Sequence, residues 1–411
     1  MSDGVNTTEI MPQMARVAID MLAAIDHKPF KQRAKEVAKA LLGRGRASDR
    51  DPLFWPAGFL LLGLTESDIP EARETAVQYY RRWCDKKIPV RYADDALAGY
   101  AALRLYEETG DASARETAVT VYQFLKDAPR DAAGSIIYHP SAANRCVFAD
   151  GAGMTALFLA AYGRHDGRTA AYERLPGADQ PVGDTGLTVS GFAALQLDNY
   201  RKYGMDERTG LPYHGYLLRE ANGGASENAA GEATTDVFLS EKKGIIGWGR
   251  AVGFLLMGAS AVAAMQRDDD AAEPEKHSDH IAGAADIART LSAAAHAAIR
   301  PDGLFSWQLT APEGHVDTSA TAMIGWALAQ METEIADRTA STVTQKATLT
   351  ERSGIDRMAE ALRDYVTSEG RMTESLAECV DFGEHPQRYG VYPWGQGAAM
   401  AFLSAADFCS E

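Results

Sequence analysis

Apolar residues recur every three or four positions along almost the whole chain. This spacing places apolar side chains on one face of a helix, whereas alternation of apolar and polar residues, which is almost missing, would indicate half-buried strands. The predicted helices are 10–26, 31–43, 53–64, 70–86, 92–108, 112–127, 149–163, 187–204, 247–265, 278–298, 318–335, 353–367 and 394–409. The sequence therefore predicts an all-α fold of paired helical hairpins.

These helices divide by composition into two layers. The segments richest in alanine, glycine and large apolar residues fit an inner layer, and they are 92–103, 149–161, 247–264, 317–329 and 394–405. The more charged segment 70–86 fits an outer layer. The sequence has no repeat of fixed period, so a solenoid of tandem repeats is not supported. We expect a closed toroid of helix pairs instead.

Three connections between the predicted helices are unusually long: 129–146, 205–247 and 300–318. Loops of this length in a compact domain are usually functional or disordered. Each of the three leads into a segment assigned to the inner layer. We therefore expect the functional site where these loops meet the starts of the inner helices.

Composition limits the class of protein. The chain has 411 residues, 46% of them hydrophobic, and no convincing linker, so we expect one domain over 1–411. A net charge of −16 argues against nucleic acid and anionic membranes as partners. We find no signal-peptide pattern at the start and no apolar run that is long enough for a membrane span. The four cysteines are widely spaced, which predicts reduced thiols and a cytoplasmic location.

Acidic residues stand at the starts of two apolar helices. Asp150 lies in CVFADGAGMTALFLAAYG, and the pair Asp94–Asp95 lies in RYADDALAGYAALRLYEETGD. A carboxylate in this position can cap the helix or remain a solvated acid of the first turn. The neighbouring glycines also leave space for a ligand. We expect one pocket with an acid and a helper, in which burial by Phe148 and Met154 raises the pKa of Asp150.

Aromatic and polar residues collect near glycines in the later loops. They are His214 in RTGLPYHGYLL, Trp248 and Arg250 in GIIGWGRAVGFLLMG, Trp307 in DGLFSWQL, and Trp394 in YPWGQGAAM. Aromatic faces stack on sugar rings and fixed polar groups bind hydroxyls, so this set is typical of a carbohydrate site. Arg250 fits either a substrate carboxylate or a salt bridge between hairpins. Each tryptophan, taken alone, fits the hydrophobic core equally well.

Six motifs in order resemble the unsaturated uronyl hydrolases of glycoside hydrolase families 88 and 105. They are YADDALAGYAALRLYEETGD, CVFADGAGMTALFLA, DERTGLPYHGY, GWGRAVGFLLMG, DGLFSWQL with PEGHVDTSATAMIGWALA, and YPWGQGAAM, all within residues 90–405. The resemblance implies a six-hairpin (α/α)6 barrel with no metal or cofactor. It also implies an oligosaccharide substrate made by a polysaccharide lyase, from whose non-reducing end a 4,5-unsaturated uronic acid is removed. An acid protonates C4, and water adds at C5 of the vinyl ether.

The resemblance also implies roles for residues. Asp150 matches the general acid/base of the family, and Asp94 matches its second aspartate, with Asp95 as a close competitor. His214, Trp248 and Arg250 match positions of the sugar site. In all, we expect substrate contacts from Asp95, His214, Trp248, Arg250, Phe254, Trp307 and Trp394.

The chain departs from the family at three of its positions. Asp95 stands where histidine is frequent, Phe254 stands where tryptophan is usual, and Tyr216 ends a loop that usually ends in tryptophan. Two alternatives therefore stay open. One is an ordinary retaining or inverting glycosidase, which needs two carboxylates about 5–9.5 Å apart. The other is a sugar-binding relative that has lost the chemistry.

Overall fold

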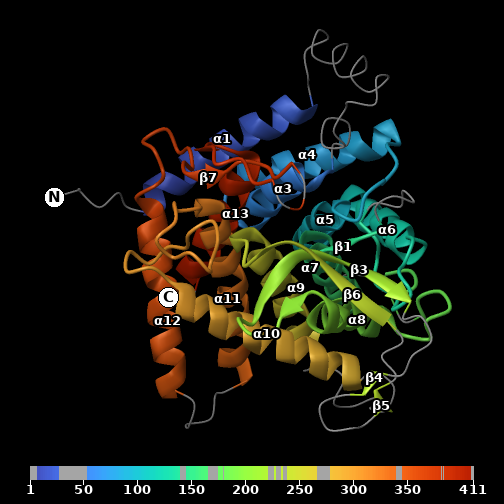
Figure 1. Cartoon of the computed structure of the whole chain (residues 1–411). Helices are drawn as coiled ribbons and strands as arrows, with labels where there is room; N and C mark the ends of the chain where they lie inside the picture. Colours follow the sequence, from blue (N-terminus) through green and yellow to red (C-terminus); the bar gives the residue numbers. More distant parts are fainter. Residues whose placement is uncertain are drawn as a thin grey trace.

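The computed structural model describes residues 7–26, 53–138, 145–164, 175–178, 180–220, 226–227, 233–234, 238–265, 278–338, 345–380, 382 and 384–408. Twelve α-helices account for most of this part of the chain (Figure 1). The helix predicted at 31–43 lies outside the described residues. The other twelve predicted helices are all present, which confirms the all-α prediction.

Six helices form a closed inner ring. They are α3 (Trp55–Glu66), α5 (Asp95–Thr109), α7 (Ala149–Arg164), α9 (Gly249–Met265), α11 (Thr318–Arg338) and α13 (Pro393–Phe408). Each packs against the next, and α13 packs against α3. Five of them are the segments predicted for the inner layer. The sixth, α3, is apolar around its whole circumference, and ten of its twelve residues are buried.

Six further helices cover the ring from outside. They are α1 (Thr7–Asp26), α4 (Pro70–Lys86), α6 (Ala112–Lys126), α8 (Val189–Tyr203), α10 (Ser278–Ala298) and α12 (Gln345–Arg363). Helix α4 shows why such a segment stays outside, because it buries only one face, with Ala72, Ala76, Tyr80 and Trp83. Outer and inner helices alternate along the chain, which makes six hairpins. The fold is the predicted (α/α)6 barrel.

The inner helices touch most closely where glycine takes the place of a side chain. A Cβ atom on Gly153 of α7 would overlap the carbonyl oxygen of Phe254 in α9. The same holds for Gly397 of α13 and the carbonyl oxygen of Phe59 in α3. These contacts let neighbouring backbones approach each other, and they bring the starts of the inner helices together.

The largest sheet lies in the connection between α8 and α9. Strand β3 (Leu211–Glu220) pairs antiparallel with β6 (Phe238–Ile246), and the short strands β1 (Val147–Phe148) and β2 (Met205–Asp206) also pair with β3. The sequence interpretation misses this hairpin. Its alternation signal is weak because nearly all residues of β6 are partly exposed instead of alternately buried and exposed. The small pairs are β4 (Ser226–Glu227) with β5 (Ala233–Thr234), and β7 (Ser375–Leu376) with β8 (Tyr389–Gly390).

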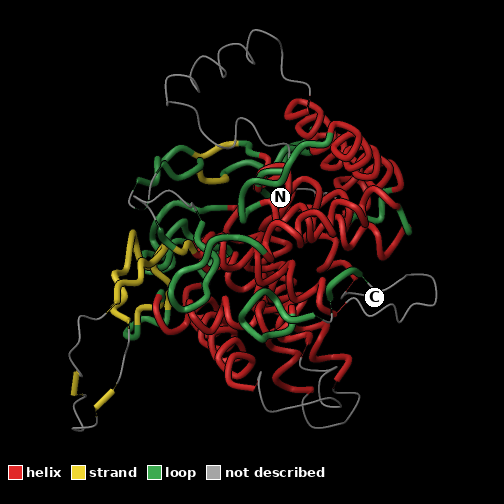
Figure 2. The backbone as a smooth tube through the Cα atoms, turned by 90° about the vertical axis from the view of Figure 1, so that its right-hand side faces the viewer, coloured by secondary structure: helices red, strands yellow, loops and turns green. Residues whose placement is uncertain are grey.

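A fourth long connection, 364–392, joins α12 to α13 and contains β7 and β8. The sequence interpretation does not single it out. The strands and many of the long connections gather on one side of the helices (Figure 2). They lie at the end of the barrel that holds the candidate active site.

The buried hydrophobic side chains form one cluster that runs from Ile10 to Ala406. One continuous core favours the prediction of a single domain, which stays a prediction. None of the described helices combines the length and the apolar character that a membrane span needs.

Candidate active site

The starts of four inner helices meet around one cavity. Trp55 begins α3, Asp150 lies in the first turn of α7, and Arg250 lies in the first turn of α9, and all three line the cavity. Asp94, directly before α5, accepts a hydrogen bond from Tyr138 of the cavity wall. Helix N-termini carry partial positive charge, so their convergence favours an anionic ligand.

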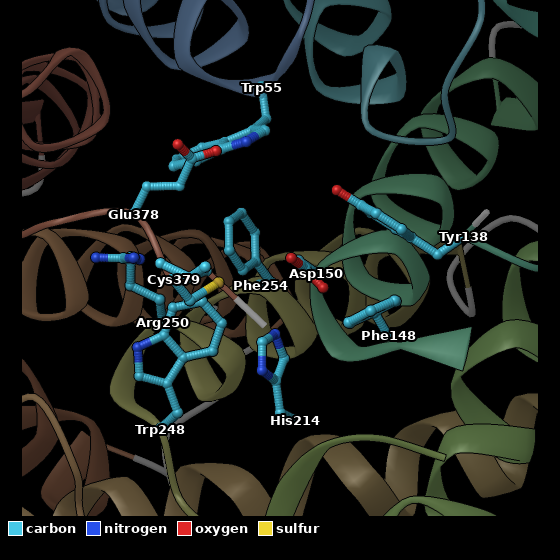
Figure 3. A pocket seen from close by; sticks show the side chains of 11 residues that line it. Trp55, Tyr138, Phe148, Asp150, His214, Trp248, Arg250, Phe254, Glu378 and Cys379 are labelled. Carbon is cyan, nitrogen blue, oxygen red and sulfur yellow. The ribbon is translucent and has the colours of Figure 1, made fainter. Parts of the chain in front are cut away.

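The cavity has a volume of about 220 Å³. Its lining residues are Trp55, Tyr138, Phe148, Asp150, His214, Trp248, Arg250, Phe254, Glu378, Cys379 and Val380. In Figure 3, Asp150, Tyr138 and Phe148 lie on one side and Arg250 and Glu378 on the other. The wall therefore combines aromatic rings with one cation and two carboxyl groups that face each other across the space.

Asp150 presents a shielded carboxyl group to this cavity. Its Oδ1 atom is buried and has no hydrogen-bond partner among the described residues. Burial raises the pKa of Asp150 to about 6, although the backbone N–H groups of Asp150 and Gly151 and the charge of Arg250 oppose the shift. The direction agrees with the sequence-based expectation. A carboxyl group with this pKa can both give and take a proton near neutral pH.

Asp94 lies deeper than Asp150. It is fully buried, and the hydroxyl group of Tyr138 donates a hydrogen bond to its Oδ2 atom. Burial, and then the negative charge of Asp150, raise the pKa of Asp94 well above its ordinary value, while the hydrogen bond from Tyr138 opposes the shift. Burial therefore favours the protonated form of both carboxyl groups of this pair.

Asp95 faces a different set of partners. Its Oδ2 atom accepts hydrogen bonds from the backbone N–H groups of Arg91 at 3.1 Å and Tyr92 at 3.5 Å. The side chain thus holds the turn that leads into α5. Neither aspartate is itself a lining residue, but Asp94 is hydrogen-bonded to Tyr138, which is one. The geometry favours Asp94 over Asp95 as the second carboxyl group of the site, and a substrate contact by Asp95 has no support from it.

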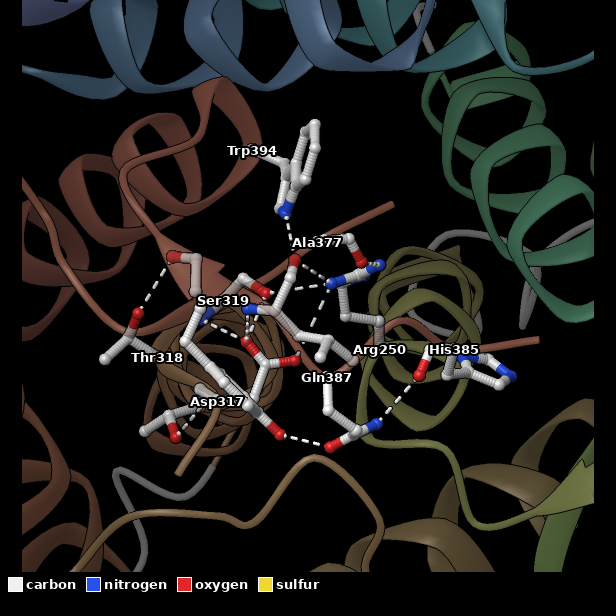
Figure 4. Close-up of polar contacts among 12 residues, drawn as sticks. Arg250, Asp317, Thr318, Ser319, Ala377, His385, Gln387 and Trp394 are labelled. Atoms are coloured by element: carbon white, nitrogen blue, oxygen red, sulfur yellow. Dashed lines mark hydrogen bonds and ion pairs between the residues drawn. The ribbon is translucent and has the colours of Figure 1, made fainter. Parts of the chain in front are cut away.

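Arg250 is held from several directions (Figure 4). Its two terminal nitrogens donate to the carbonyl oxygens of Leu376 at 2.8 Å and Ala377 at 3.0 Å. One of them also lies 3.5 Å from Ser319 Oγ and 3.7 Å from Asp317 Oδ2. Its Nε atom has no hydrogen-bond partner among the described residues. Arg250 therefore joins the hairpins, as one sequence interpretation expects, and still lines the cavity, as the other requires.

Three further predicted residues line the cavity: His214, Trp248 and Phe254. Burial lowers the pKa of His214 to about 3, so its imidazole ring is neutral at physiological pH. The guanidinium carbon of Arg250 lies 4.7 Å from the ring centre of Trp248, an arrangement that fixes both side chains. Phe254 stands where the family usually has tryptophan, and its ring also faces the cavity.

Besides Asp95, two predicted substrate contacts lie outside the lining. Trp394 packs between Trp55 and Tyr392, with ring centres 4.7 Å and 4.6 Å away, and its Nε1 atom donates to the carbonyl oxygen of Leu376. Both of its faces are therefore covered by protein. The ring centre of Trp307 lies 5.8 Å from that of His385, which is not a lining residue either. In this structure, Trp394 supports the cavity wall and Trp307 borders it at a distance.

Sequence reasoning misses several of the lining residues. Tyr138 lies in the connection 129–146, which the sequence marks as functional, but the residue itself carries no special pattern. Glu378 and Cys379 lie in the connection 364–392, whose length alone is a usable signal. Trp55 follows the motif-poor start of the chain. The common feature of these residues is that each lies in the connection before an inner helix or at the start of the helix itself.

Polar atoms without protein partners concentrate at this site. Among the described residues, buried atoms without a hydrogen-bond partner include Asp94 Oδ1, Asp150 Oδ1, His214 Nε2, Trp248 Nε1, Arg250 Nε and both ring nitrogens of His385. Buried polar groups in folded proteins are nearly always paired, so this concentration favours a site for a polar ligand. The set offers donors and acceptors together, which suits a sugar that carries hydroxyl groups and a carboxylate.

Comparison with known proteins agrees with this chemistry. The model of glycosyl hydrolase family 88 matches residues 44–407. No curated protein matches the chain in sequence.

Solved structures share the fold at low sequence identity. A possible member of glycoside hydrolase family 105 from Klebsiella pneumoniae is 15% identical, with a TM-score of 0.68 over 100% of this chain and 96% of that one. The unsaturated glucuronyl hydrolase of Bacillus sp. GL1 is 16% identical, with a TM-score of 0.60 over 86% of each chain. An unsaturated glucuronyl hydrolase specific for heparin is 13% identical, with a TM-score of 0.61 over 98% of each chain.

Proposed function

The chain belongs to glycosyl hydrolase family 88, and we propose that it removes a 4,5-unsaturated uronic acid from the non-reducing end of lyase-generated oligosaccharides. The observation that carries the proposal is the cavity itself. It combines a carboxyl group with a pKa of about 6, a buried arginine and unpaired polar atoms in one aromatic-lined space. Protonation of a vinyl ether next to a carboxylate needs this combination of an acid and a cation.

Asp150 is the acid and the base of the proposed reaction. Its carboxyl group gives a proton to C4, the C4=C5 electron pair forms the new C–H bond, and C5 and the ring oxygen share the positive charge. Water then adds at C5 and returns a proton to the carboxylate of Asp150. The hemiketal at C5 opens to a ketone, and the hemiacetal at C1 collapses to an aldehyde and releases the second sugar as an alcohol. Positioned acid–base groups of this kind typically contribute ~10²–10⁴-fold to the rate.

Asp94 and Tyr138 support Asp150. The raised pKa of Asp94 favours its neutral form beside Asp150. A neutral neighbour adds no repulsion when Asp150 becomes a carboxylate. The hydrogen bond from Tyr138 holds Asp94 in place, and the ring of Tyr138 packs 4.5 Å from that of Phe148 in the cavity wall.

Arg250 provides the anion-binding end of the cavity. Guanidinium groups bind carboxylates well, and this one is fixed by the carbonyl oxygens of Leu376 and Ala377 before any ligand binds. The volume of about 220 Å³ lies below the roughly 300–1,000 Å³ of typical ligand pockets, which suits a single sugar ring. A pocket for one ring fits removal of one terminal unit.

The experiment is a screen of lyase digests of pectin, chondroitin, hyaluronan and heparin. The C4=C5 bond absorbs in the ultraviolet, so we expect the absorbance of at least one digest to fall. In heavy water, the proposed chemistry places deuterium at C4 of the product. An ordinary glycosidase would also cleave the matched saturated uronyl glycosides, which have no C4=C5 bond to protonate, and a binding protein would leave every digest unchanged. Either result would refute the proposal.

A further inference from the structure

The charged groups of the cavity favour a substrate with only one anionic group. Among the described lining residues, Arg250 is the permanent cation, whereas Asp150 and Glu378 are carboxyl groups. His214 adds no positive charge, because its pKa is lowered to about 3. The charge of Glu378 acts within this space, since it helps to raise the pKa values of Asp94 and Cys379.

The number of anionic groups that Arg250 can bind is limited as well. Its terminal nitrogens already serve the carbonyl oxygens of Leu376 and Ala377, and Asp317 lies 3.7 Å from one of them. These contacts leave the guanidinium able to bind one carboxylate. A uronic acid ring brings one. A sulfate ester on the same ring would need a second cation, and the described lining offers none.

Glu378 is carried by a firmly anchored backbone. It lies two residues after Leu376, the last residue of β7. Leu376 is held by two residues of inner helices and by Asp317, directly before α11. Arg250 Nη1 and Trp394 Nε1 donate to the carbonyl oxygen of Leu376 at 2.8 Å and 3.0 Å, and the N–H group of Leu376 donates to Asp317 Oδ1 at 3.1 Å. Glu378 and Trp55 both line the cavity. An aromatic ring and a carboxylate in one cavity wall make a suitable surface for a sugar ring with free hydroxyl groups.

We propose that Glu378 is a specificity-determining residue that accepts hydrogen bonds from sugar hydroxyl groups and disfavours a second anionic group, so that the substrates are unsulfated unsaturated uronyl oligosaccharides. The inference rests on the proposed function, which it narrows. It assigns the protein to digests of pectin or of unsulfated glycosaminoglycans. It also separates this cavity from one built for highly sulfated chains.

The test compares two unsaturated disaccharides that differ only in a sulfate ester at O2 of the unsaturated ring. Each is measured as a competitive inhibitor of turnover of the most active lyase digest. For the wild type we expect inhibition by the sulfated disaccharide to be weaker by about tenfold or more, since like charges inside a binding site strongly disfavour association. Glu378→Gln keeps an acceptor oxygen and removes the charge, so we expect the difference to shrink about fivefold or more.

The control variant is Glu374→Gln. Glu374 lies in the same connection, but its side chain is 38% exposed and pairs with His315 instead of lining the cavity. We expect this variant to keep the wild-type inhibition ratio and turnover. Thermal unfolding of both variants shows whether they remain folded. Glu378→Ala provides a second measure, because it should weaken binding of the unsulfated disaccharide, whereas Glu378→Gln should largely preserve it.

The outcomes separate the two proposals. If no digest loses ultraviolet absorbance, the proposed function is wrong and this inference is wrong with it. If a digest is turned over but both disaccharides inhibit equally, or neither inhibits, only the inference about Glu378 is overturned. An unchanged ratio in folded Glu378→Gln also overturns it.

Discussion

Asp150 and Asp94 stand at the starts of neighbouring inner helices, and the negative charge of Asp150 raises the pKa of Asp94 beyond the effect of burial alone. The pKa values of both carboxyl groups are raised, that of Asp150 to about 6. Paired carboxyl groups in different environments commonly divide the acid and supporting roles of a site. Asp150 is then the group that changes its charge near neutral pH.

The first prediction is the pH dependence of turnover. Because the reaction begins with transfer of a proton from Asp150 to C4, kcat should fall as the pH rises through about 6. A pH profile of kcat on the best digest, in buffers of constant ionic strength, measures this. A profile that stays flat well above pH 6 would show that protonated Asp150 is not required.

The second prediction concerns stability. The folded state raises the pKa of Asp150 from 3.8 to about 6, so it holds this proton more tightly than the unfolded chain does. The resulting stabilisation is complete below the lower value and is lost as the pH rises through the higher one. Asp150→Asn removes the ionisable group and should be more stable than the wild type at about pH 8, by on the order of 2–3 kcal/mol.

Thermal unfolding of the wild type and Asp150→Asn across this pH range provides the measurement. The difference between the two proteins should shrink as the pH falls below about 6. A constant difference at all pH values would contradict a raised pKa for Asp150.

The third prediction separates the two adjacent aspartates. Asp94→Asn removes the buried carboxyl group beside Asp150 and should lower kcat while the free energy of unfolding stays the same or rises. Asp95→Ala removes the acceptor for the N–H groups of Arg91 and Tyr92, and should lower the free energy of unfolding by about 1 kcal/mol, with a smaller loss of kcat. The reverse pattern would make Asp95 the second carboxyl group of the site.

The fourth prediction concerns Arg250. Lysine keeps the positive charge but cannot serve the carbonyl oxygens of both Leu376 and Ala377. Leaving one of these buried acceptors unpaired should lower the free energy of unfolding by about 1–3 kcal/mol, and KM should rise because the anion-binding group loses its fixed orientation. Denaturant unfolding and KM of Arg250→Lys test both effects.

Arg81→Lys is the matched control for that substitution. Arg81 is a surface arginine whose side chain is 55% exposed and pairs with Asp111. Exposed ion pairs contribute little, so neither stability nor KM should change measurably. If Arg250→Lys behaves in the same way, Arg250 neither anchors β7 nor orients the substrate.

The sequence predicts the helices well because their signal is local. Each hairpin helix carries its own apolar period, and the composition of five inner segments marks their layer. Helix α3 is missing from these five segments although it is apolar around its whole circumference. The hairpin of β3 and β6 escapes because its partly exposed residues do not alternate.

The sequence predicts only those residues of the site that lie in local motifs. Asp150, His214, Trp248, Arg250 and Phe254 lie in recognisable motifs, and all five line the cavity. The partners that hold Arg250 are backbone carbonyl oxygens of Leu376 and Ala377, which any residue could provide. Contacts of this kind leave no trace in the sequence. The covered faces of Trp394 likewise depend on tertiary packing and not on its motif.

The fifth prediction tests the central claim most directly. It is the turnover of the most active lyase digest by the wild type and by Asp150→Asn, followed as loss of ultraviolet absorbance. Asparagine keeps the shape of the side chain and removes the proton that C4 must receive, so we expect a loss of ~10²–10⁴-fold in kcat with substrate binding largely kept. Turnover by Asp150→Asn at the wild-type rate would contradict the role of Asp150 and, with it, the proposed reaction.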